Sequence, residues 1–262
     1  MAVTQGDLGE IVQTPGWLRK FHRPRAEDPA PLLIFPHAGG GASIYRPFSK
    51  VLSERFDVTL FQYPGRQDRA HEPALGTLPE IAAGAFAEFR SSSLDSGAPL
   101  TLFGHSMGAL VAFEFARLAE AAGLPIRLLA VSGAVAPWLV ADLPPHPTED
   151  EQLLDHLVGL NGTGADVLTN RELMRMTLPV LKADYRAFDA YACGQDVLLR
   201  TDIHAMGGSD DEHVTMGDLY EWQRHTDREL AVTLFDGGHF YLHDHVADIA
   251  ELLSAEPVSV RR

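Results

Sequence analysis

The residues best suited to chemistry are a serine, a histidine and a group of carboxylates that lie far apart along the chain. Ser106 stands in Gly104-His-Ser-Met-Gly108, between an apolar run and a helical pattern. A glycine-bracketed serine at a strand-to-helix turn is typical of a nucleophile elbow, which presents the hydroxyl at the helix N-terminus. There the Met107 N–H and the helix dipole would stabilise a developing oxyanion. A serine at this place could also be a simple helix N-cap.

A serine nucleophile needs a base, and the base needs an acid that orients it. His239 is the candidate base, because it follows the last predicted strand in the glycine-flanked loop Phe235-Asp-Gly-Gly-His239. The candidate acids are Asp210, Asp211 and Glu212, which follow the preceding strand. The carboxyl ends of parallel strands meet at one edge of a sheet, so these carboxylates could reach the histidine. Three adjacent acids could equally form a solvated turn.

Other motifs bear on a second oxyanion donor, a metal site and a nucleotide site. The loop Pro36-His-Ala-Gly-Gly-Gly41 follows the first predicted strand, and its Ala38 N–H is best placed to serve as the donor. A flexible connection would contain the same glycines. His243 and His245 are close together, but no cluster with zinc spacing accompanies them, and we expect no metal. The glycine loop lacks the Lys-Ser/Thr of a P-loop, so nucleotide binding is not predicted.

The elements that must position these residues alternate between strand and helix patterns. The predicted strands cover residues 31–35, 58–62, 100–103, 128–132, 197–205 and 230–235. The predicted helices cover residues 44–54, 77–90, 107–122, 217–224 and 244–254. Thr77 and Glu80 have the spacing of a capping box, and Gly123 can end a helix in the left-handed conformation. This alternation predicts an α/β fold with a mostly parallel sheet and helices on both faces.

The alternation breaks between residues 138 and 184. Pro144-Pro-His-Pro147 opens this stretch, and short amphipathic segments follow at residues 151–160 and 171–181. We interpret the stretch as a helical lid inserted into one core. The predicted units are a first part of the core at residues 1–137, the lid at 138–184 and a second part of the core at 185–262.

Composition limits the classes of partner. The 262 residues carry a formal charge of −15, which argues against nucleic acid and anionic membranes as partners. The N-terminus lacks the pattern of a signal peptide, and the longest apolar stretch, residues 128–141, is too short to span a membrane. Cys193 is the single cysteine, so no intramolecular disulfide can form within this sequence. We therefore expect a cytoplasmic protein, and a monomer is the simplest expectation.

Five stretches together resemble the stand-alone type II thioesterases that accompany polyketide synthases and non-ribosomal peptide synthetases, within the α/β-hydrolase superfamily. They occur in the family's order, and the second and fourth are the most specific to it. The stretches are Phe35-Pro-His-Ala-Gly-Gly, Gln62-Tyr-Pro-Gly-Arg-Gln-Asp-Arg69, Gly104-His-Ser-Met-Gly, Leu178-Pro-Val-Leu-Lys-Ala-Asp-Tyr185 and Gly237-Gly-His-Phe240.

The resemblance implies the α/β-hydrolase fold with a lid, and it assigns roles to individual residues. Ser106 would be the nucleophile, His239 the base and Asp211 the acid, with Ala38 and Met107 as the oxyanion hole.

The choice of acid rests on the family's pattern Gly-x-x-Asp-x-x-Val followed later by Trp. Asp211 fits that register with Val214 and Trp222. Glu212 departs from the family's usual Asp-Pro form, which leaves Asp210 as a second choice.

The implied activity is the editing of acyl groups stalled on the phosphopantetheine arm of acyl or peptidyl carrier protein domains, with no cofactor of the enzyme's own. The lid would shape an apolar acyl chamber, although the same side chains could form only the lid's own core. The candidate chamber residues are Leu153, Leu157, Met174, Met176 and Leu178.

Carrier proteins are usually acidic, so a chain of charge −15 would need a local basic patch or an apolar contact to dock. The candidates for such a patch are Arg19, Lys20, Arg23, Arg25, Arg66 and Arg69, with Arg66 alternatively buttressing the Tyr-Pro-Gly turn. The rival functions are a carboxylesterase or acyl-releasing cyclase of the same fold and, more remotely, a non-catalytic binding protein of that fold.

Overall fold

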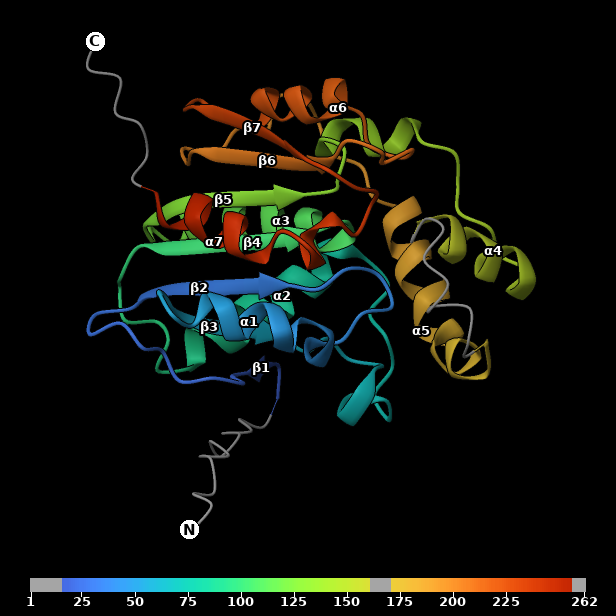
Figure 1. Ribbon diagram of the computed structural model, residues 1–262, viewed down its shortest axis with the longest axis horizontal. Coiled ribbons are helices and arrows are strands. Elements are labelled where there is room, and N and C mark those ends of the chain that lie inside the picture. The colour runs from blue at the N-terminus through green and yellow to red at the C-terminus, as the bar shows by residue number, and fades with distance from the viewer. Residues whose placement is uncertain (1–15, 161–170, 256–262) are drawn as a thin grey trace, which may run out of the picture.

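A single sheet forms the centre of the described structure, and its strands run across Figure 1. The structure is a computed structural model that describes residues 16–160 and 171–255. Within these residues the sheet has seven strands in the order β1-β3-β2-β4-β5-β6-β7. They are β1 (Leu18–Arg19), β2 (Ala30–Phe35), β3 (Phe56–Phe61), β4 (Leu100–His105), β5 (Ile126–Ser132), β6 (Ile203–Gly208) and β7 (Leu230–Phe235).

All neighbouring strands are parallel except the short edge strand β1, which pairs antiparallel with β3. The chain places β3 on one side of β2 and β4 on the other, so the strand order reverses between β2 and β4. The two strands end in register, with Phe35 opposite Gly104. A crevice opens at the carboxyl ends of strands where the order reverses, because the two following loops diverge to opposite faces of the sheet.

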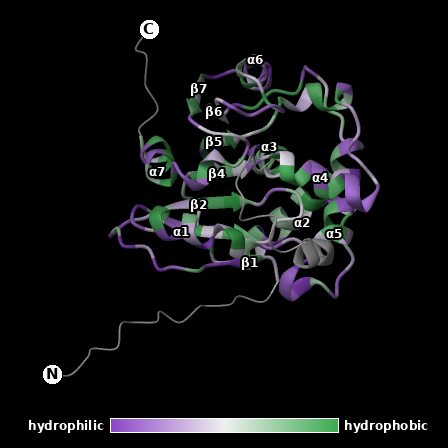
Figure 2. Cartoon of the chain, turned by 45° about the vertical axis from the view of Figure 1, so that its right-hand side comes forward, coloured by the Kyte–Doolittle hydropathy of each residue, from purple (hydrophilic) through white to green (hydrophobic). Residues whose placement is uncertain are grey.

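Helices cover both faces of the sheet, as expected for parallel strands. Apolar side chains of α2, α3 and α6 pack on one face, and those of α1 and α7 pack on the other. In Figure 2 most of β2 is green, whereas α6 at the periphery is largely purple. The helices on the faces are α1 (Arg46–Leu52), α2 (Leu78–Ser91), α3 (Met107–Ala121), α6 (Met216–Tyr220) and α7 (Val246–Ser254).

Two further helices lie beyond the carboxyl ends of the strands rather than on a face of the sheet (Figure 1). They are α4 (Asp150–Leu160) and α5 (Arg171–Asp189), and they share an apolar cluster of their own. These helices fall in the stretch predicted as a lid. The helix α5 contains Pro179 and continues past residue 184 to Asp189. The predicted second part of the core, which starts at residue 185, therefore begins inside a helix.

Most predicted elements are present, and the differences have local causes. Gly123 has φ +74° and follows α3, and Thr77 caps α2 by accepting the Glu80 N–H at 3.3 Å. The predicted strand 197–205 was wrong over residues 197–202, because β6 begins only at Ile203. The Glu120 carboxylate of α3 accepts the Arg200 N–H at 2.8 Å, which occupies a donor that a strand would use.

Other differences concern the ends of elements. The predicted helix 217–224 divides into α6 and a 3₁₀ turn at Glu221–His225, and a 3₁₀ turn at Ala42–Tyr45 precedes α1. The edge strand β1 was not predicted, because two residues are too few to show a period. Within the described ranges, no helix has the length and apolar character needed to cross a membrane.

Candidate active site

Ser106 lies between the end of β4 and the start of α3, in a backbone conformation that residues other than glycine rarely adopt. Its φ is +54° and its ψ is −126°, and its N–H donates to the Ser132 carbonyl of β5 at 2.7 Å. A non-glycine residue held in such a conformation costs about 1–3 kcal/mol and is typical of functional sites. In the described structure the Ser106 side chain makes no capping hydrogen bond to α3. The geometry therefore favours the elbow over the simple N-cap.

The glycines around Ser106 allow two strands and a helix to meet backbone to backbone. A Cβ on Gly104 would lie 2.1 Å from the Gly108 carbonyl oxygen. A Cβ on Gly108 would lie 2.0 Å from the Phe35 carbonyl oxygen at the end of β2. Both separations are far below contact distance, so only glycine fits at either position. This packing fixes Ser106 at the crevice where the strand order reverses.

His239 follows β7 and makes a hydrogen bond with Asp211, which follows β6. The distance from His239 Nδ1 to Asp211 Oδ2 is 2.8 Å, and both residues are buried. Burial acts to raise the pKa of Asp211, but the hydrogen bond and charge of His239 outweigh it and hold that pKa below its ordinary value. Because Nδ1 faces a carboxylate, it carries the ring hydrogen, and Nε2 is left as the basic nitrogen.

The neighbouring candidate acids do not make this contact. Asp210 is exposed, and its N–H donates to the Gly237 carbonyl at 2.9 Å, which ties the loop after β6 to the loop that carries His239. Glu212 is exposed as well and lines the edge of the cavity described below. Of the three adjacent acids, Asp211 is the one that the fold brings to the histidine.

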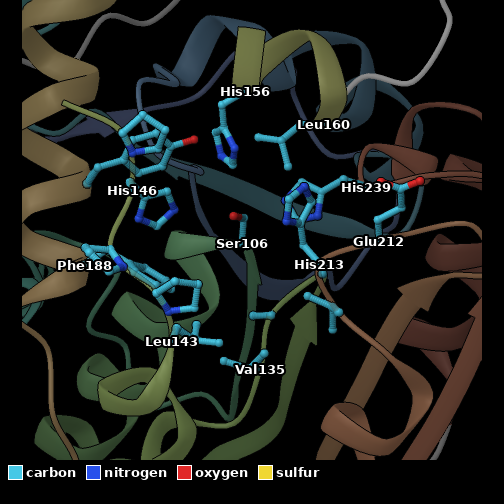
Figure 3. A pocket seen from close by; sticks show the side chains of 17 residues that line it. Ser106, Val135, Leu143, His146, His156, Leu160, Phe188, Glu212, His213 and His239 are labelled. Carbon is cyan, nitrogen blue, oxygen red and sulfur yellow. The ribbon is translucent and has the colours of Figure 1, made fainter. Parts of the chain in front are cut away.

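A cavity of about 420 Å³ connects the serine and the histidine. Ser106 and His239 both line it, and Figure 3 shows them facing the same space. A second cavity of about 270 Å³ also reaches Ser106 and His239 and is lined by Ala38 of the loop after β2. Ala38 therefore lines a cavity that reaches Ser106, and Met107 follows Ser106 directly as the first residue of α3. The two predicted oxyanion donors thus stay a prediction.

His105 packs against His239 and was not predicted as a functional residue. It is fully buried, its ring lies 5.0 Å from that of His239, and its Nδ1 lies 3.0 Å from Ser132 Oγ. That hydroxyl is in turn 2.6 Å from the Tyr241 hydroxyl. Burial, followed by the charge of His239, holds the pKa of His105 well below its usual range. His105 therefore stays neutral and adds no positive charge beside the base.

The loop after β2 is held by a buried ion pair that the sequence did not predict. Asp184 of α5 accepts the Gly39 N–H at 2.7 Å and binds both Nη atoms of Arg66 at 2.8 Å. Arg66 also donates to the Gly40 carbonyl at 3.3 Å. Two stretches that carried the family resemblance thus meet at the predicted oxyanion loop. Their shared chemistry explains why an arginine and an aspartate occur in them.

This arrangement corrects part of the predicted docking patch. Arg66 is 4% exposed and supports the Tyr-Pro-Gly turn, as its alternative role required. Arg69 is also buried and makes two hydrogen bonds to the Glu72 carboxylate. Arg19 is buried and pairs with Asp68 at 2.5 Å. These three arginines are structural, and of the predicted patch they leave Lys20, Arg23 and Arg25 as the more accessible members.

The predicted chamber residues divide into two groups. Leu153 and Leu178 are buried in the cluster shared by α4 and α5, so they form the core of this helix pair. Leu157 lines the smaller cavity. The side chains of Met174 and Met176 lie outside the described residues. The larger cavity is lined instead by several residues that sequence reasoning missed, including Val135, Leu143, His146, His156, Tyr185, Phe188 and His213.

Neither the single cysteine nor a metal site adds a reactive group to the described structure. Cys193 is partly buried, and burial raises the pKa of its thiol, which argues against a nucleophilic role. In the described part of the chain, no group of three or more His, Cys, Asp or Glu residues has the geometry to hold a metal ion.

Comparison with known proteins places the chain in a family. A model of the thioesterase domain matches residues 30–256. Phenyloxazoline synthase MbtB of Mycobacterium tuberculosis is 43% identical over 92% of this chain, which spans only 17% of that relative's length. Thioesterase PikA5 of Streptomyces venezuelae is 37% identical, with 91% of this chain and 84% of that protein covered.

A solved structure agrees with these sequence matches. The type II thioesterase BorB from the borrelidin biosynthetic cluster superposes with a TM-score of 0.76 and 37% identity, and the match covers 93% of this chain and 97% of BorB. The α/β-hydrolase fold is therefore established by both the sheet and the comparison. The chain belongs to the thioesterase family, and over nearly its whole length it is similar to the type II thioesterases within it.

Proposed function

We propose that this protein is an editing thioesterase, which hydrolyses aberrant or stalled acyl groups from the phosphopantetheine arm of acyl or peptidyl carrier protein domains. The observation that carries the proposal is the strained Ser106 at a cavity shared with His239, whose Nδ1 is bonded to Asp211. The match to type II thioesterases along the whole chain supports the same function.

The first half of the reaction forms an acyl-enzyme. His239 Nε2 accepts the Ser106 proton as the hydroxyl oxygen attacks the thioester carbonyl carbon. The Ala38 and Met107 N–H groups donate to the oxyanion of the tetrahedral intermediate, and Asp211 stabilises the imidazolium that forms. Collapse of the intermediate breaks the C–S bond. The imidazolium returns its proton to the departing thiolate, which leaves as the free phosphopantetheine thiol.

The second half of the reaction releases the acid. His239 removes a proton from a water molecule, which attacks the acyl-Ser106 ester. The oxyanion donors act again, and Ser106 leaves with the proton that His239 held. The products are a carboxylic acid and the original enzyme. The protein needs no cofactor of its own in these steps, because the reactive thioester arrives on the partner's arm.

We also propose that residues 138–184 act as the lid of this enzyme. Support comes from α4 and α5, which lie beyond the carboxyl ends of the strands, and from Leu160 of α4, which lines both cavities that reach Ser106. A lid over Ser106 would exclude bulk water from the active site and would shape the acyl chamber. The protein would act as a cytoplasmic monomer. It would dock to carrier proteins through a local surface, because its overall charge of −15 repels acidic partners.

The test is hydrolysis of a carrier-bound thioester by the full chain. Acetyl and butyryl groups loaded on a carrier protein are incubated with the wild type and with Ser106→Ala, and release is followed by intact mass. We expect free acid and free carrier from the wild type and a loss of at least about 10³-fold with Ser106→Ala.

Other outcomes would point elsewhere. Release of a lactone or lactam instead of the acid would indicate a cyclase, and faster turnover of simple oxygen esters than of the thioesters would indicate an esterase. Release that does not depend on Ser106 would contradict the proposed mechanism.

A further inference from the structure

Three histidines line the acyl cavity in addition to His239, and the proposed mechanism uses none of them. They come from separate segments: His146 from the loop before α4, His156 from α4, and His213 from the loop after β6. The ring centroids of His146 and His156 are 5.5 Å apart, and those of His156 and His213 are 5.3 Å apart. His213 lies 6.4 Å from His239, so the rings form a continuous arc that begins at the proposed base.

Figure 3 shows the arc around the serine. The rings of His146 and His156 lie on the lid side of Ser106, and His213 and His239 lie across the cavity from His146. The other walls are apolar and include Val135, Leu143, Leu160 and Phe188. An acyl chain attached to Ser106 would therefore meet hydrocarbon on most sides and imidazole nitrogens along one line.

His146 is held in place by Asp189 and Tyr185. Its Nδ1 lies 2.6 Å from Asp189 Oδ1, and its backbone N–H donates to Asp189 Oδ2 at 3.0 Å. Its ring stacks on Tyr185 with the centroids 3.8 Å apart and the planes 11° from parallel. Because Nδ1 faces the carboxylate and carries a hydrogen there, Nε2 is the ring nitrogen left for a ligand in the cavity.

His156 and His213 keep hydrogen-bonding capacity for a ligand. Within residues 16–160 and 171–255, neither ring is assigned a hydrogen-bond partner, although His156 stands in a half-buried position. Burial lowers the pKa of His156 to about 4, and the neighbouring His146 and His213 add to the effect. At neutral pH this ring is therefore uncharged and offers one N–H donor and one nitrogen acceptor.

The charges near the arc disfavour an anionic acyl group. A carboxylate would need a cation to offset its desolvation, and the uncharged His156 ring at the centre of the arc does not supply one. Glu212 lines the same cavity and would repel a carboxylate, as would the protein's charge of −15. A hydroxyl or keto oxygen carries no charge, and its hydrogen-bonding groups match those of a neutral imidazole.

We infer that the histidine arc, defined as His146, His156 and His213, selects short acyl groups that carry a neutral hydroxyl or keto oxygen beyond the thioester carbonyl. The inference rests on the proposed function and names the substrate class of that same site. Saturated chains of equal length remain substrates, because the apolar walls receive them, but they leave the imidazole nitrogens without partners.

The experiment compares small thioesters, so that carrier docking does not enter the result. The kcat/KM values of the full chain are measured for butyryl, 3-hydroxybutyryl, 3-oxobutyryl and malonyl thioesters of N-acetylcysteamine. We expect the two oxygenated neutral chains to exceed butyryl by about tenfold, the effect of one or two well-placed neutral hydrogen bonds. Malonyl should be the poorest of the four.

Variants of the arc test whether the histidines cause this preference. His156→Phe keeps an aromatic ring but removes both nitrogens, and it should reduce the ratio of 3-hydroxybutyryl to butyryl to about one while butyryl turnover persists. His156→Gln, which keeps a donor and an acceptor, should retain part of the preference. His213→Phe, at an exposed position, should weaken the preference without risk to folding. His71→Phe, at an exposed position outside both cavities, is the matched control and should leave the ratio unchanged.

Three results would overturn the inference. They are equal or better turnover of butyryl by the wild type, a preference for malonyl, and a hydroxybutyryl preference that survives in both His156→Phe and His213→Phe. Absence of Ser106-dependent release from every thioester is a separate result, because it would contradict the proposed function itself and with it the substrate class.

Discussion

Asp210 and Asp211 are neighbours with the same side chain but different surroundings. The Asp211 carboxylate accepts hydrogen bonds from His239 Nδ1 and from the His213 N–H at 2.9 Å, whereas Asp210 is exposed. A buried carboxylate on Nδ1 fixes the tautomer of the imidazole, so that Nε2 is free to accept a proton. The two residues therefore offer a matched pair of variants.

We predict that Asp211→Asn lowers kcat on a carrier-bound acyl thioester by roughly 10³- to 10⁴-fold, because the amide favours the wrong tautomer of His239. Asp210→Asn should change kcat by less than about twofold. Steady-state kinetics of both variants, with circular dichroism to confirm folding, checks the prediction. Equal losses in the two variants would show that the acid loop acts as a charged surface and that Asp211 has no special role.

At the scale of elements, the contacts of one ion pair connect three segments that lie far apart in the sequence. Asp184 belongs to α5, Arg66 to the turn after β3, and Gly39 to the loop after β2. The Asp184 side chain is fully buried and that of Arg66 is 4% exposed, so both charges depend on each other for solvation. A displacement of α5 would withdraw the acceptor from the Gly39 N–H. The ion pair therefore couples the position of α5 to that of the loop after β2, which carries the proposed oxyanion donor Ala38.

We predict that Asp184→Asn lowers the free energy of unfolding by about 3–5 kcal/mol, because it leaves the Arg66 guanidinium buried without a counter-ion. The residual folded enzyme should show a reduced kcat, since the loop that carries Ala38 loses its anchor. Urea unfolding and single-turnover acylation measure the two effects.

The exposed pair Arg25–Glu54 provides the matched control for this prediction. Glu54→Gln should change the free energy of unfolding by less than about 1 kcal/mol, because water already solvates both charges. The double variant Asp184→Asn with Arg66→Met should recover part of the lost stability, because the unpaired charge is gone. A double variant as unstable as the sum of the single variants would contradict the coupling.

At the scale of the whole molecule, buried neutral histidines make stability depend on pH. Burial lowers the pKa of His37 to about 3, with smaller contributions from His239 and His243, and it holds that of His105 well below its ordinary value. His225 is fully buried and its pKa is also lowered by burial. In the unfolded chain the same rings titrate near about 6.5. The unfolded state therefore binds more protons than the folded state below that pH.

We predict that the free energy of unfolding is at its plateau above about pH 6.5 and falls as the pH decreases below it. Each histidine with a lowered folded pKa contributes a slope of up to about 1.4 kcal/mol per pH unit in this window. Urea unfolding at pH 7, 6 and 5 measures the slope. His37→Gln and His105→Gln should each make it shallower. A free energy of unfolding that is equal at pH 7 and pH 5 would contradict the prediction.

The sequence predicted most of the elements and the candidate reacting groups. Strand and helix periods are local, so the alternation of strands and helices from β2 to α3 can be predicted from short windows of sequence. The glycine-bracketed Ser106 between β4 and α3 can be recognised in the same way. The position of His239 after the last strand follows for the same reason. These features depend on residues only a few positions away, so local residue types and spacing are enough to predict them.

Only the tertiary structure decided which distant groups meet. His239 and Asp211 are 28 residues apart, and Arg66 and Asp184 are 118 residues apart. The register of β6 against β7 brings Asp211 rather than Asp210 to the histidine, and the packing of α5 over the sheet edge buries Arg66 instead of leaving it for docking. The histidine arc likewise joins three segments. Such contacts depend on how strands pair and helices pack, which no local pattern in the sequence records.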